Sequence, residues 1–590
     1  MTSTASDAAS RTPAHETVEI AARRRRRDDG HEGAGGRVVG CERSVRPAAE
    51  RPAVPPVELG VRKGRSPARP LTAADVTTGG HSGQFWQYVG MTSETQAKAG
   101  HRGIPSNNEF RDFIASGWAT PDREPTHRAE VADHAARRRA VLSQRFPGER
   151  LVIPAGGLKV RSNDTDYPFR PHTAFAHLTG LGAHADPDSV LVLDPKPGGG
   201  HHATLYFRPL APRDSEEFYA DSRYGEFWVG PRPTLADRES ELGITARHVD
   251  SLADDLAKDA PAARMRVVRA ADPQLAGLVE SVRAQAGATG SAHEREEADE
   301  ELARHLSAMR LVKDEWEIEE MRTAIAATHR GFDAIVASLP EAVRKGRGER
   351  WVEGVFGLYS RHEGNGVGYE SVCASGDHAN TIHWTRNTGE VREGDLILVD
   401  CGIELDSLFT ADITRTLPVS GRFTDVQRRI YDAVYEAQQA GLAAVRPGNK
   451  FSDIHAAADA VIARTLHQWG LLPEGVTVEQ TLDRERGGWH RRWMVHGTSH
   501  HLGMDVHDCQ LLLREDYMNV VLEPGMILTV EPGLYFKADD LLAPEEFRGI
   551  GVRIEDDVLV TEDGCENLSA AMPRTSQGVE EWIKRVWANA

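Results

Sequence analysis

Two aspartates in the C-terminal half of the chain have the setting of a metal-binding pair. Asp400 closes the apolar run 396–399, and Asp412 begins the next apolar segment. If the turn between them centres near Asp406, a hairpin places the two carboxylates opposite each other on adjacent strands. Carboxylates this close repel unless a cation lies between them. A surface hairpin with two exposed acids is the alternative, but the strand before Asp400 is very apolar for that.

A cluster of histidines follows about ninety residues later along the chain. His496, His500, His501 and His507 are interleaved with glycines, which is typical of a loop that lines a cleft. Histidine is the commonest transition-metal ligand and the usual acid–base group near neutral pH. A single histidine is more often structural, but a cluster indicates a site. The pattern leaves open which of these side chains binds a metal.

Two glutamates complete a set rich in oxygen donors. Glu531 ends an apolar strand directly before a Pro-Gly turn, where its carboxylate would face a cleft. In the segment 549–560, the period-two alternation of a strand sends Arg553 and Glu555 to one face. Several carboxylates with one imidazole nitrogen suit Mn²⁺ or a similar divalent ion better than a thiolate-bound zinc. The residue types therefore predict a site for hard divalent cations.

The elements that must position these side chains alternate between helix and strand. A basic amphipathic helix is predicted over 134–146, followed by strands such as 150–154 and 189–194, which together indicate an α/β domain. The charged segment 294–301 predicts an exposed helical connector. A second amphipathic helix, over 316–337, opens the larger C-terminal domain that carries the candidate site.

Composition restricts the partners of this chain. Its 590 residues exceed a single hydrophobic core, and its net charge of −19 disfavours nucleic acids and anionic membranes. No apolar run is long enough to span a membrane. Five scattered cysteines without a CxxC pair argue against disulfides and zinc–thiolate sites. We therefore expect a cytoplasmic protein that acts on a peptide or small molecule.

The first 90 residues differ from the remainder. They contain the arginine run 23–27 and the proline-rich stretch 51–56, with little apolar periodicity. These features predict a disordered tail over 1–90, with Met91 a candidate start of the native protein. A nucleic-acid-binding role for the arginine run is the alternative.

The segments around these acids and histidines resemble the pita-bread metallopeptidases, and among them the aminopeptidase P (Xaa-Pro aminopeptidase) family. The resemblance extends into the first domain, at 164–170 and 178–180. It implies an α/β N-terminal domain over 126–290 and an α+β pita-bread catalytic domain over 305–575, in a homo-oligomer. In the catalytic domain it rests on Asp400, 411–416, 496–500, 529–535 and 549–557.

The resemblance also implies a ligand set for two divalent metal ions per subunit, most simply Mn²⁺. Asp412 and Glu555 would bridge the ions, Asp400 would hold one, and His500 with Glu531 would hold the other. The connection between the two aspartates is one residue longer than in better-known members. That difference affects the expected turn more than the ligands.

Further residues correspond to the family's catalytic and substrate-contacting groups. His383, His496 and His507 match its active-site histidines, and Tyr535 and Arg553 are expected at the pocket for the proline ring. Arg553 has a second interpretation, as a partner of the metal-binding carboxylates. An arginine expected shortly before the Thr-Val-Glu-Pro-Gly segment has no obvious counterpart.

Trp228, in the first domain, allows two interpretations. An aromatic residue there is more often part of the core. The segment around Trp228 is also similar to one that, in this family, approaches an active site across a subunit contact. In that case Trp228 would bind substrate.

The chemistry implied is hydrolysis of the bond that precedes a proline. A pair of divalent ions lowers the pKa of a bound water toward neutrality. Glu531 is expected to carry the proton to the leaving nitrogen, and His507 to donate to the developing oxyanion. The substrates would be peptides with proline at the second position.

Other members of the fold are the alternatives. Prolidase shares the ligands but cleaves only dipeptides, and methionine aminopeptidase would lack the first domain. Creatinase-like enzymes and non-catalytic pita-bread binding proteins lack the metal ligands. The complete ligand set argues against the last two and leaves prolidase as the nearest rival.

Overall fold

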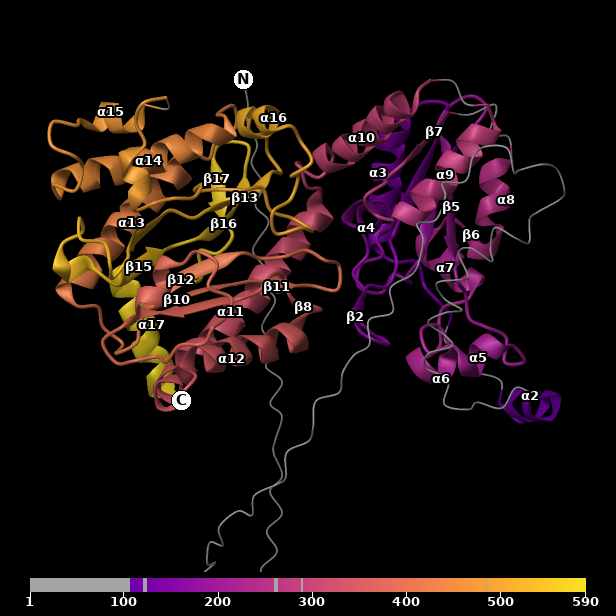
Figure 1. Cartoon of the computed structure of the whole chain (residues 1–590), viewed down its shortest axis with the longest axis horizontal. Coiled ribbons are helices and arrows are strands. Elements are labelled where there is room, and N and C mark those ends of the chain that lie inside the picture. Colours follow the sequence, from indigo (N-terminus) through magenta and orange to yellow (C-terminus); the bar gives the residue numbers. More distant parts are fainter. Residues whose placement is uncertain (1–106, 120–124, 259–263, 288–289, 484, 590) are drawn as a thin grey trace, which may run out of the picture. The chain divides into compact units, whose positions relative to one another are not determined.

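The computed structural model describes residues 107–119, 125–258, 264–287, 290–483 and 485–589 (Figure 1). The tail predicted over 1–90 lies outside these residues. Within the described part of the chain, no helix is both long and apolar enough to cross a membrane.

The first domain is built on a five-stranded sheet in the order β6-β5-β4-β1-β7. The central pair, β1 (Glu149–Pro154) and β4 (Val190–Pro195), is antiparallel, as is the pair of β4 with β5 (His201–Phe207). The outer strands β7 (Arg264–Val267) and β6 (Thr245–His248) run parallel to β1 and β5. The predicted strands at 150–154 and 189–194 are therefore confirmed.

Alternation along the strands divides the core of this domain between the two faces of the sheet. On one face, Leu151 and Ile153 share a cluster with residues of helices α3 (Val131–Arg145), α4 (Thr173–Thr179) and α10 (Ala292–Ala308). On the other, Val152 shares a cluster with α8 (Leu252–Ala257) and α9 (Pro273–Gln285). Both faces of the sheet are thus covered by helices, as expected of an α/β domain. Smaller elements are α2 (Asn108–Ala115), β2 (Val160–Ser162), β3 (Thr165–Asp166), α5 (Glu216–Ala220), α6 (Glu226–Val229), α7 (Leu235–Leu242) and η1 (Val249–Ser251).

The charged connector is helical and solvent-accessible, as the sequence predicts, except at one acidic residue. It forms the helix α10, but Asp299 within it is buried and accepts hydrogen bonds from Arg283 Nη2 at 2.6 Å and from the backbone N–H of Val267 at 2.9 Å. A buried charge is stable when it is paired and hydrogen-bonded. This acid therefore anchors the connector to the first domain.

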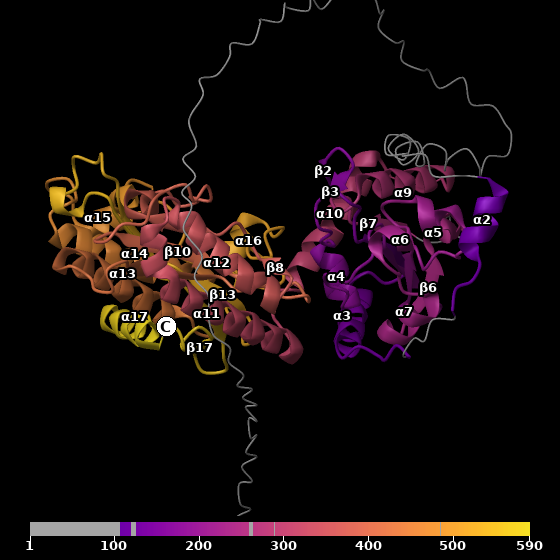
Figure 2. The same ribbon diagram turned by 90° about the horizontal axis from the view of Figure 1, so that it is seen from below.

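The second domain opens with α11 (Glu315–Arg344), which begins at a capping box formed by Asp314 and Glu317. The helix is longer than the predicted 316–337, because Leu339 and Ala342 continue its buried stripe while Pro340 faces outward. It packs beside α12 (Gly348–Glu363), and the pair is seen side by side in both views (Figures 1 and 2).

Two further long helices, α13 (Asp425–Ala444) and α14 (Phe451–Gln468), form a second pair. The helices cover small antiparallel sheets ordered β12-β10-β9 and β13-β16-β17, with the two-stranded pairs β14-β15 and β11-β8. Other elements of this domain are β9 (Val372–Ser375), η2 (Gly376–Asn380), α15 (Val478–Leu482), η3 (Trp489–Arg492), α16 (Arg514–Asn519), η4 (Glu545–Phe547) and α17 (Ser576–Asn589).

The predicted hairpin that places Asp400 opposite Asp412 is wrong in register. Strands β10 (Leu396–Cys401) and β12 (Ile413–Pro418) do pair, but Asp400 faces Thr414, and Asp412 precedes the first paired residue. The connection continues the hairpin, since Glu404 bridges Thr410 and the N–H of Leu405 donates to the carbonyl of Phe409 at 3.0 Å, so the turn centres at Ser407, one residue after Asp406. On its other edge, β11 (Ile403–Glu404) bonds to β8 (Gly366–Val367).

The segment 549–560 forms two strands where one was predicted. β15 (Ile550–Arg553) pairs with β14 (Gly533–Phe536). After a break, β16 (Asp556–Val560) pairs with β13 (Ile527–Val530) and β17 (Cys565–Asn567). Glu555 lies in the break between the two sheets, and this position brings its carboxylate to the site described next.

Candidate metal centre

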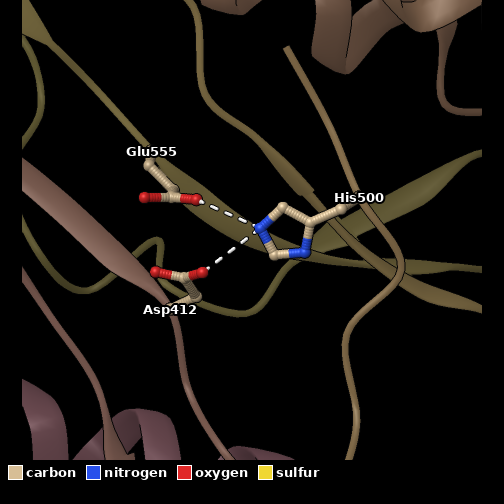
Figure 3. A group of neighbouring side chains, drawn as sticks. All are labelled: Asp412, His500 and Glu555. Atoms are coloured by element: carbon tan, nitrogen blue, oxygen red, sulfur yellow. Dashed lines mark ion pairs between the residues drawn. The ribbon is translucent and has the colours of Figure 1, made fainter. Parts of the chain in front are cut away.

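Three buried side chains from separate segments converge inside the second domain (Figure 3). Asp412 directly precedes β12, His500 lies in the loop between η3 and α16, where its carbonyl accepts from the N–H of Thr529 in β13, and Glu555 lies between β15 and β16. His500 Nε2 is 3.2 Å from Asp412 Oδ2 and 3.9 Å from Glu555 Oε1. Each side chain offers a ligand atom, and these atoms lie within 4.8 Å of one another.

Glu531 and Asp400 adjoin this group. Glu531 Oε1 is 3.8 Å from His500 Nε2. The hydroxyl oxygen of Tyr369 lies 2.8 Å from Asp400 Oδ1 and 2.5 Å from Asp412 Oδ1, so its one proton lies within hydrogen-bond distance of both aspartates. The structure thus brings together the whole ligand set expected from the sequence.

The charges of this cluster favour bound cations. Burial and the neighbouring acids raise the pKa of Glu531 to about 7 and raise the pKa of Glu555 well above its usual range. Burial lowers the pKa of His500, but the hydrogen bond and charge of Asp412 outweigh this and raise that pKa to about 9. Such shifts arise when carboxylates are crowded without a counter-charge. A donor set of carboxylates and one imidazole fits divalent ions of the Mn²⁺ type.

Arg553 supplies positive charge at the edge of the cluster. Its side chain is buried, and it donates to Asp400 Oδ2, to the Tyr535 hydroxyl at 3.0 Å and to Thr414 Oγ1 at 3.2 Å. Arg553 was expected either at the pocket for the proline ring or as a partner of the metal-binding carboxylates. The geometry favours the second interpretation. Tyr535 in turn is 2.8 Å from His496 Nε2, which joins the arginine to the histidine loop.

The histidines occupy different environments. The ring of His507 lies edge-on to that of His500, with centroids 4.4 Å apart, and His507 is exposed. His383 is also exposed, after η2. Partial desolvation and the charge of His500 lower the pKa of His507, and His383 acts in the same direction. His501 is instead a core residue, since its buried ring stacks on Phe451 at 4.6 Å.

Sequence reasoning missed several groups that hold the carboxylates. Tyr369 lies outside the recognised segments, and nothing in the sequence signals it. Thr414 donates from Oγ1 to Glu555 Oε2 at 2.6 Å, and Asp557 accepts from the backbone N–H of Asp412 at 3.1 Å. The two-residue spacing from Asp412 to Thr414 along one strand was the available signal for Thr414.

The interpretation of Trp228 as a core residue is wrong. Its side chain is 54% exposed, and its indole N–H donates to the carbonyl of Tyr219 at 2.8 Å. The helix α6 that carries it is a single turn between Gly225 and Gly230, and Phe227 beside it is also more than half exposed. A helix of one turn is too short to bury one of its faces against the core, and none of its residues is buried.

Comparison with known proteins extends over both domains. Residues 319–562 match the model of metallopeptidase family M24, and residues 134–268 match the aminopeptidase P N-terminal domain. The chain is 50% identical over 477 residues to Xaa-Pro aminopeptidase 2 of Streptomyces coelicolor, covering 81% of this chain and 96% of that protein. It is 33% identical over 446 residues to Xaa-Pro aminopeptidase of Escherichia coli, covering 75% and 96%.

Comparison with solved structures points to the same family. Aminopeptidase PepP of Pseudomonas aeruginosa superposes with a TM-score of 0.67 at 29% identity, covering 78% of this chain and 99% of that one. Aminopeptidase P of Escherichia coli with the inhibitor Pro-Leu gives a TM-score of 0.67 at 30% identity, with the same coverage.

Proposed function

The chain belongs to the M24 metallopeptidases, in their aminopeptidase P group, and from this premise we propose how its buried acids and histidines act on a peptide. It is an Xaa-Pro aminopeptidase, which releases the N-terminal residue that precedes proline. The observation that carries the proposal is the convergence of Asp412, His500 and Glu555, with Asp400 and Glu531 beside them, in one buried cluster.

Membership of this family implies divalent metal ions, and the cluster fits them. We propose two Mn²⁺ ions per subunit, with Asp412 and Glu555 shared by both, Asp400 on one ion, and His500 with Glu531 on the other. When bound, such a pair lowers the pKa of a water toward neutrality.

Side chains of the protein would transfer the proton, stabilise the oxyanion and bind the substrate. Glu531 would take a proton from the attacking water and pass it to the proline nitrogen as the bond breaks. His507, exposed at the edge of the cluster, would donate to the oxyanion that develops on the scissile carbonyl. His383 and His496 would help to shape the pocket for the proline ring, with His496 oriented by the Tyr535 hydroxyl. Arg553 would hold Asp400 in place through its hydrogen bond.

Peptide length should separate this function from that of a prolidase. A prolidase needs a free cation for the proline carboxylate, whereas Arg553 is engaged by Asp400 and Tyr535. A dipeptide would therefore bring its carboxylate next to an acidic cluster without a counter-charge. We expect Ala-Pro-Ala to be cleaved with a higher kcat/KM than Ala-Pro.

The measurement is alanine release from both peptides under identical Mn²⁺ conditions. Ala-Ala-Ala serves as the control for the proline requirement and should be cleaved poorly. A clear preference for Ala-Pro would replace the aminopeptidase assignment with prolidase.

We propose a homo-oligomer in which Trp228, whose side chain is exposed, approaches the active site of another subunit, as the resemblance to the family implies. We expect Trp228→Ala to lower kcat/KM for longer peptides while the melting temperature stays within about 2 °C, because the side chain is mostly exposed. Leu541→Ala, which removes another exposed apolar side chain, is the matched control. Parallel losses of stability and activity would contradict the substrate-binding role.

We also propose a cytoplasmic location. The described cysteines, Cys373, Cys401, Cys509 and Cys565, are free thiols, as is usual in a reducing compartment. The acidic composition disfavours nucleic acids and anionic membranes as partners.

A further inference from the structure

An arginine of the first domain joins the two loops that carry residues of the metal cluster. Arg170 Nε donates to Glu404 Oε2 at 2.7 Å, and Arg170 Nη2 donates to the carbonyl of Met504 at 2.6 Å. Glu404 lies in the connection between Asp400 and Asp412. Met504 lies between His500 and His507. A single guanidinium therefore spans the aspartate connection and the histidine loop.

A second contact from the same domain reinforces the first. Thr173 Oγ1 donates to Asp505 Oδ1 at 2.6 Å, and Arg170 Nη1 is 3.3 Å from the same oxygen. On the other side of His507, buried Asp508 pairs with Arg310 Nη2 at 2.8 Å. The segment 504–508 is thus held at both ends by charged groups.

His507 depends on this segment for its position. Its ring lies against that of His500 but makes no hydrogen bond to any residue that the structure describes. With an exposed side chain and no polar tether of its own, its orientation follows the backbone between Met504 and Asp508. Small displacements of a group that acts in the transition state reduce turnover steeply.

We propose that Arg170 is a positioning residue for His507, so that the first domain holds part of the catalytic apparatus in place. This proposal rests on the proposed function of His507 as donor to the oxyanion. Arg170 is suited to the task because its planar fork donates in fixed directions to Glu404 and to Met504 at once, which a lysine cannot reproduce.

The molecule offers a matched control. Arg138 also links the two domains, through Asp314 Oδ2 at 2.9 Å, but it reaches the start of α11 and neither loop of the metal cluster. Its side chain is more deeply buried than that of Arg170, at 8% against 36% exposed. Arg138→Ala should therefore reduce stability at least as much as Arg170→Ala without the same effect on turnover.

The test is a double-mutant cycle on the full chain with saturating Mn²⁺ and Ala-Pro-Ala. We expect Arg170→Ala to lower kcat about 10- to 100-fold with KM nearly unchanged, and Arg170→Lys to recover part of the loss. His507→Ala should lower kcat by at least as much. The double variant should resemble His507→Ala alone, because residues that act as a unit are not additive.

Hydrogen exchange provides a readout independent of activity. The N–H of Asp508 donates to the carbonyl of His501 at 3.0 Å, and that of Gly503 to Asp505 at 3.3 Å. Both amides should exchange faster in Arg170→Ala than in the wild type or in Arg138→Ala.

Three results would overturn the proposal. The first is a loss of kcat in the double variant that equals the product of the two single losses. The second is a loss of kcat in Arg138→Ala as large as that in Arg170→Ala. The third is loss of bound metal from Arg170→Ala in saturating Mn²⁺. Failure of the proposed function would look different, because the wild-type protein itself would then not release alanine from Ala-Pro-Ala.

Discussion

Replacing Asp412 by asparagine should lower kcat/KM for Ala-Pro-Ala by about a thousandfold or more, while the protein stays folded. A thousandfold loss corresponds to about 4 kcal/mol in the activation free energy, which is within what a metal pair contributes to hydrolysis. The amide keeps the shape of the carboxylate but not its charge. The substitution also removes one negative charge from a cluster whose acids already raise each other's pKa values. We therefore expect no loss in the free energy of unfolding.

Metal content and activity should change together. Chelation should abolish turnover of the wild-type protein, and Mn²⁺ should restore it, whereas Asp412→Asn should stay inactive in Mn²⁺. Asp539→Asn, at an exposed aspartate, is the matched control and should behave as the wild type. Near-normal turnover of Asp412→Asn would show that this residue does not bridge two ions.

The largest loss of stability should come from Arg415→Met, about 3–5 kcal/mol in the free energy of unfolding. Arg415 and Asp556 are both fully buried, and Arg415 Nη2 donates to Asp556 Oδ1 at 2.6 Å. Arg415 also donates to the carbonyls of Glu555 and Pro573. Methionine fills similar volume but leaves Asp556 charged and the carbonyls unpaired.

The state of charge of Asp556 supports this expectation. Burial raises its pKa, but Arg415 and Arg574 outweigh burial and hold that pKa below the usual value. A lowered folded-state pKa adds stability above the ordinary aspartate pKa, and this stability is lost as the pH falls through the folded value. At neutral pH the contribution is therefore complete, and the substitution should show its full cost there.

Denaturant unfolding at neutral pH measures the loss. Asp556→Asn introduced beside Arg415→Met should recover part of it, because it removes a buried charge that has lost its nearest partner and keeps only Arg574. Arg464→Met breaks an exposed pair with Glu436 and should cost less than about 1 kcal/mol. Equal costs for Arg415→Met and Arg464→Met would contradict the buried-pair argument.

The sequence by itself determined the chemical class of the site and the elements around it. Asp400, Asp412, His500, Glu531 and Glu555 were recognised by residue type and local motif, and they converge in the structure. Strand β1 and the start of α11 were also predictable. Apolar alternation and caps depend on neighbours along the chain, so local sequence is enough to locate them.

Tertiary structure alone decided how these pieces meet. The register that sets Asp400 against Thr414 follows from a turn centred at Ser407 rather than at Asp406. The hydroxyl of Tyr369 reaches the site from a segment without a motif. Arg170 lies in the recognised stretch 164–170, but nothing in that stretch indicates its bonds to Glu404 and Met504. Partners such as these are distant in the chain and interact through the packing of whole elements. A periodic pattern reports which face of an element is buried but not what covers it.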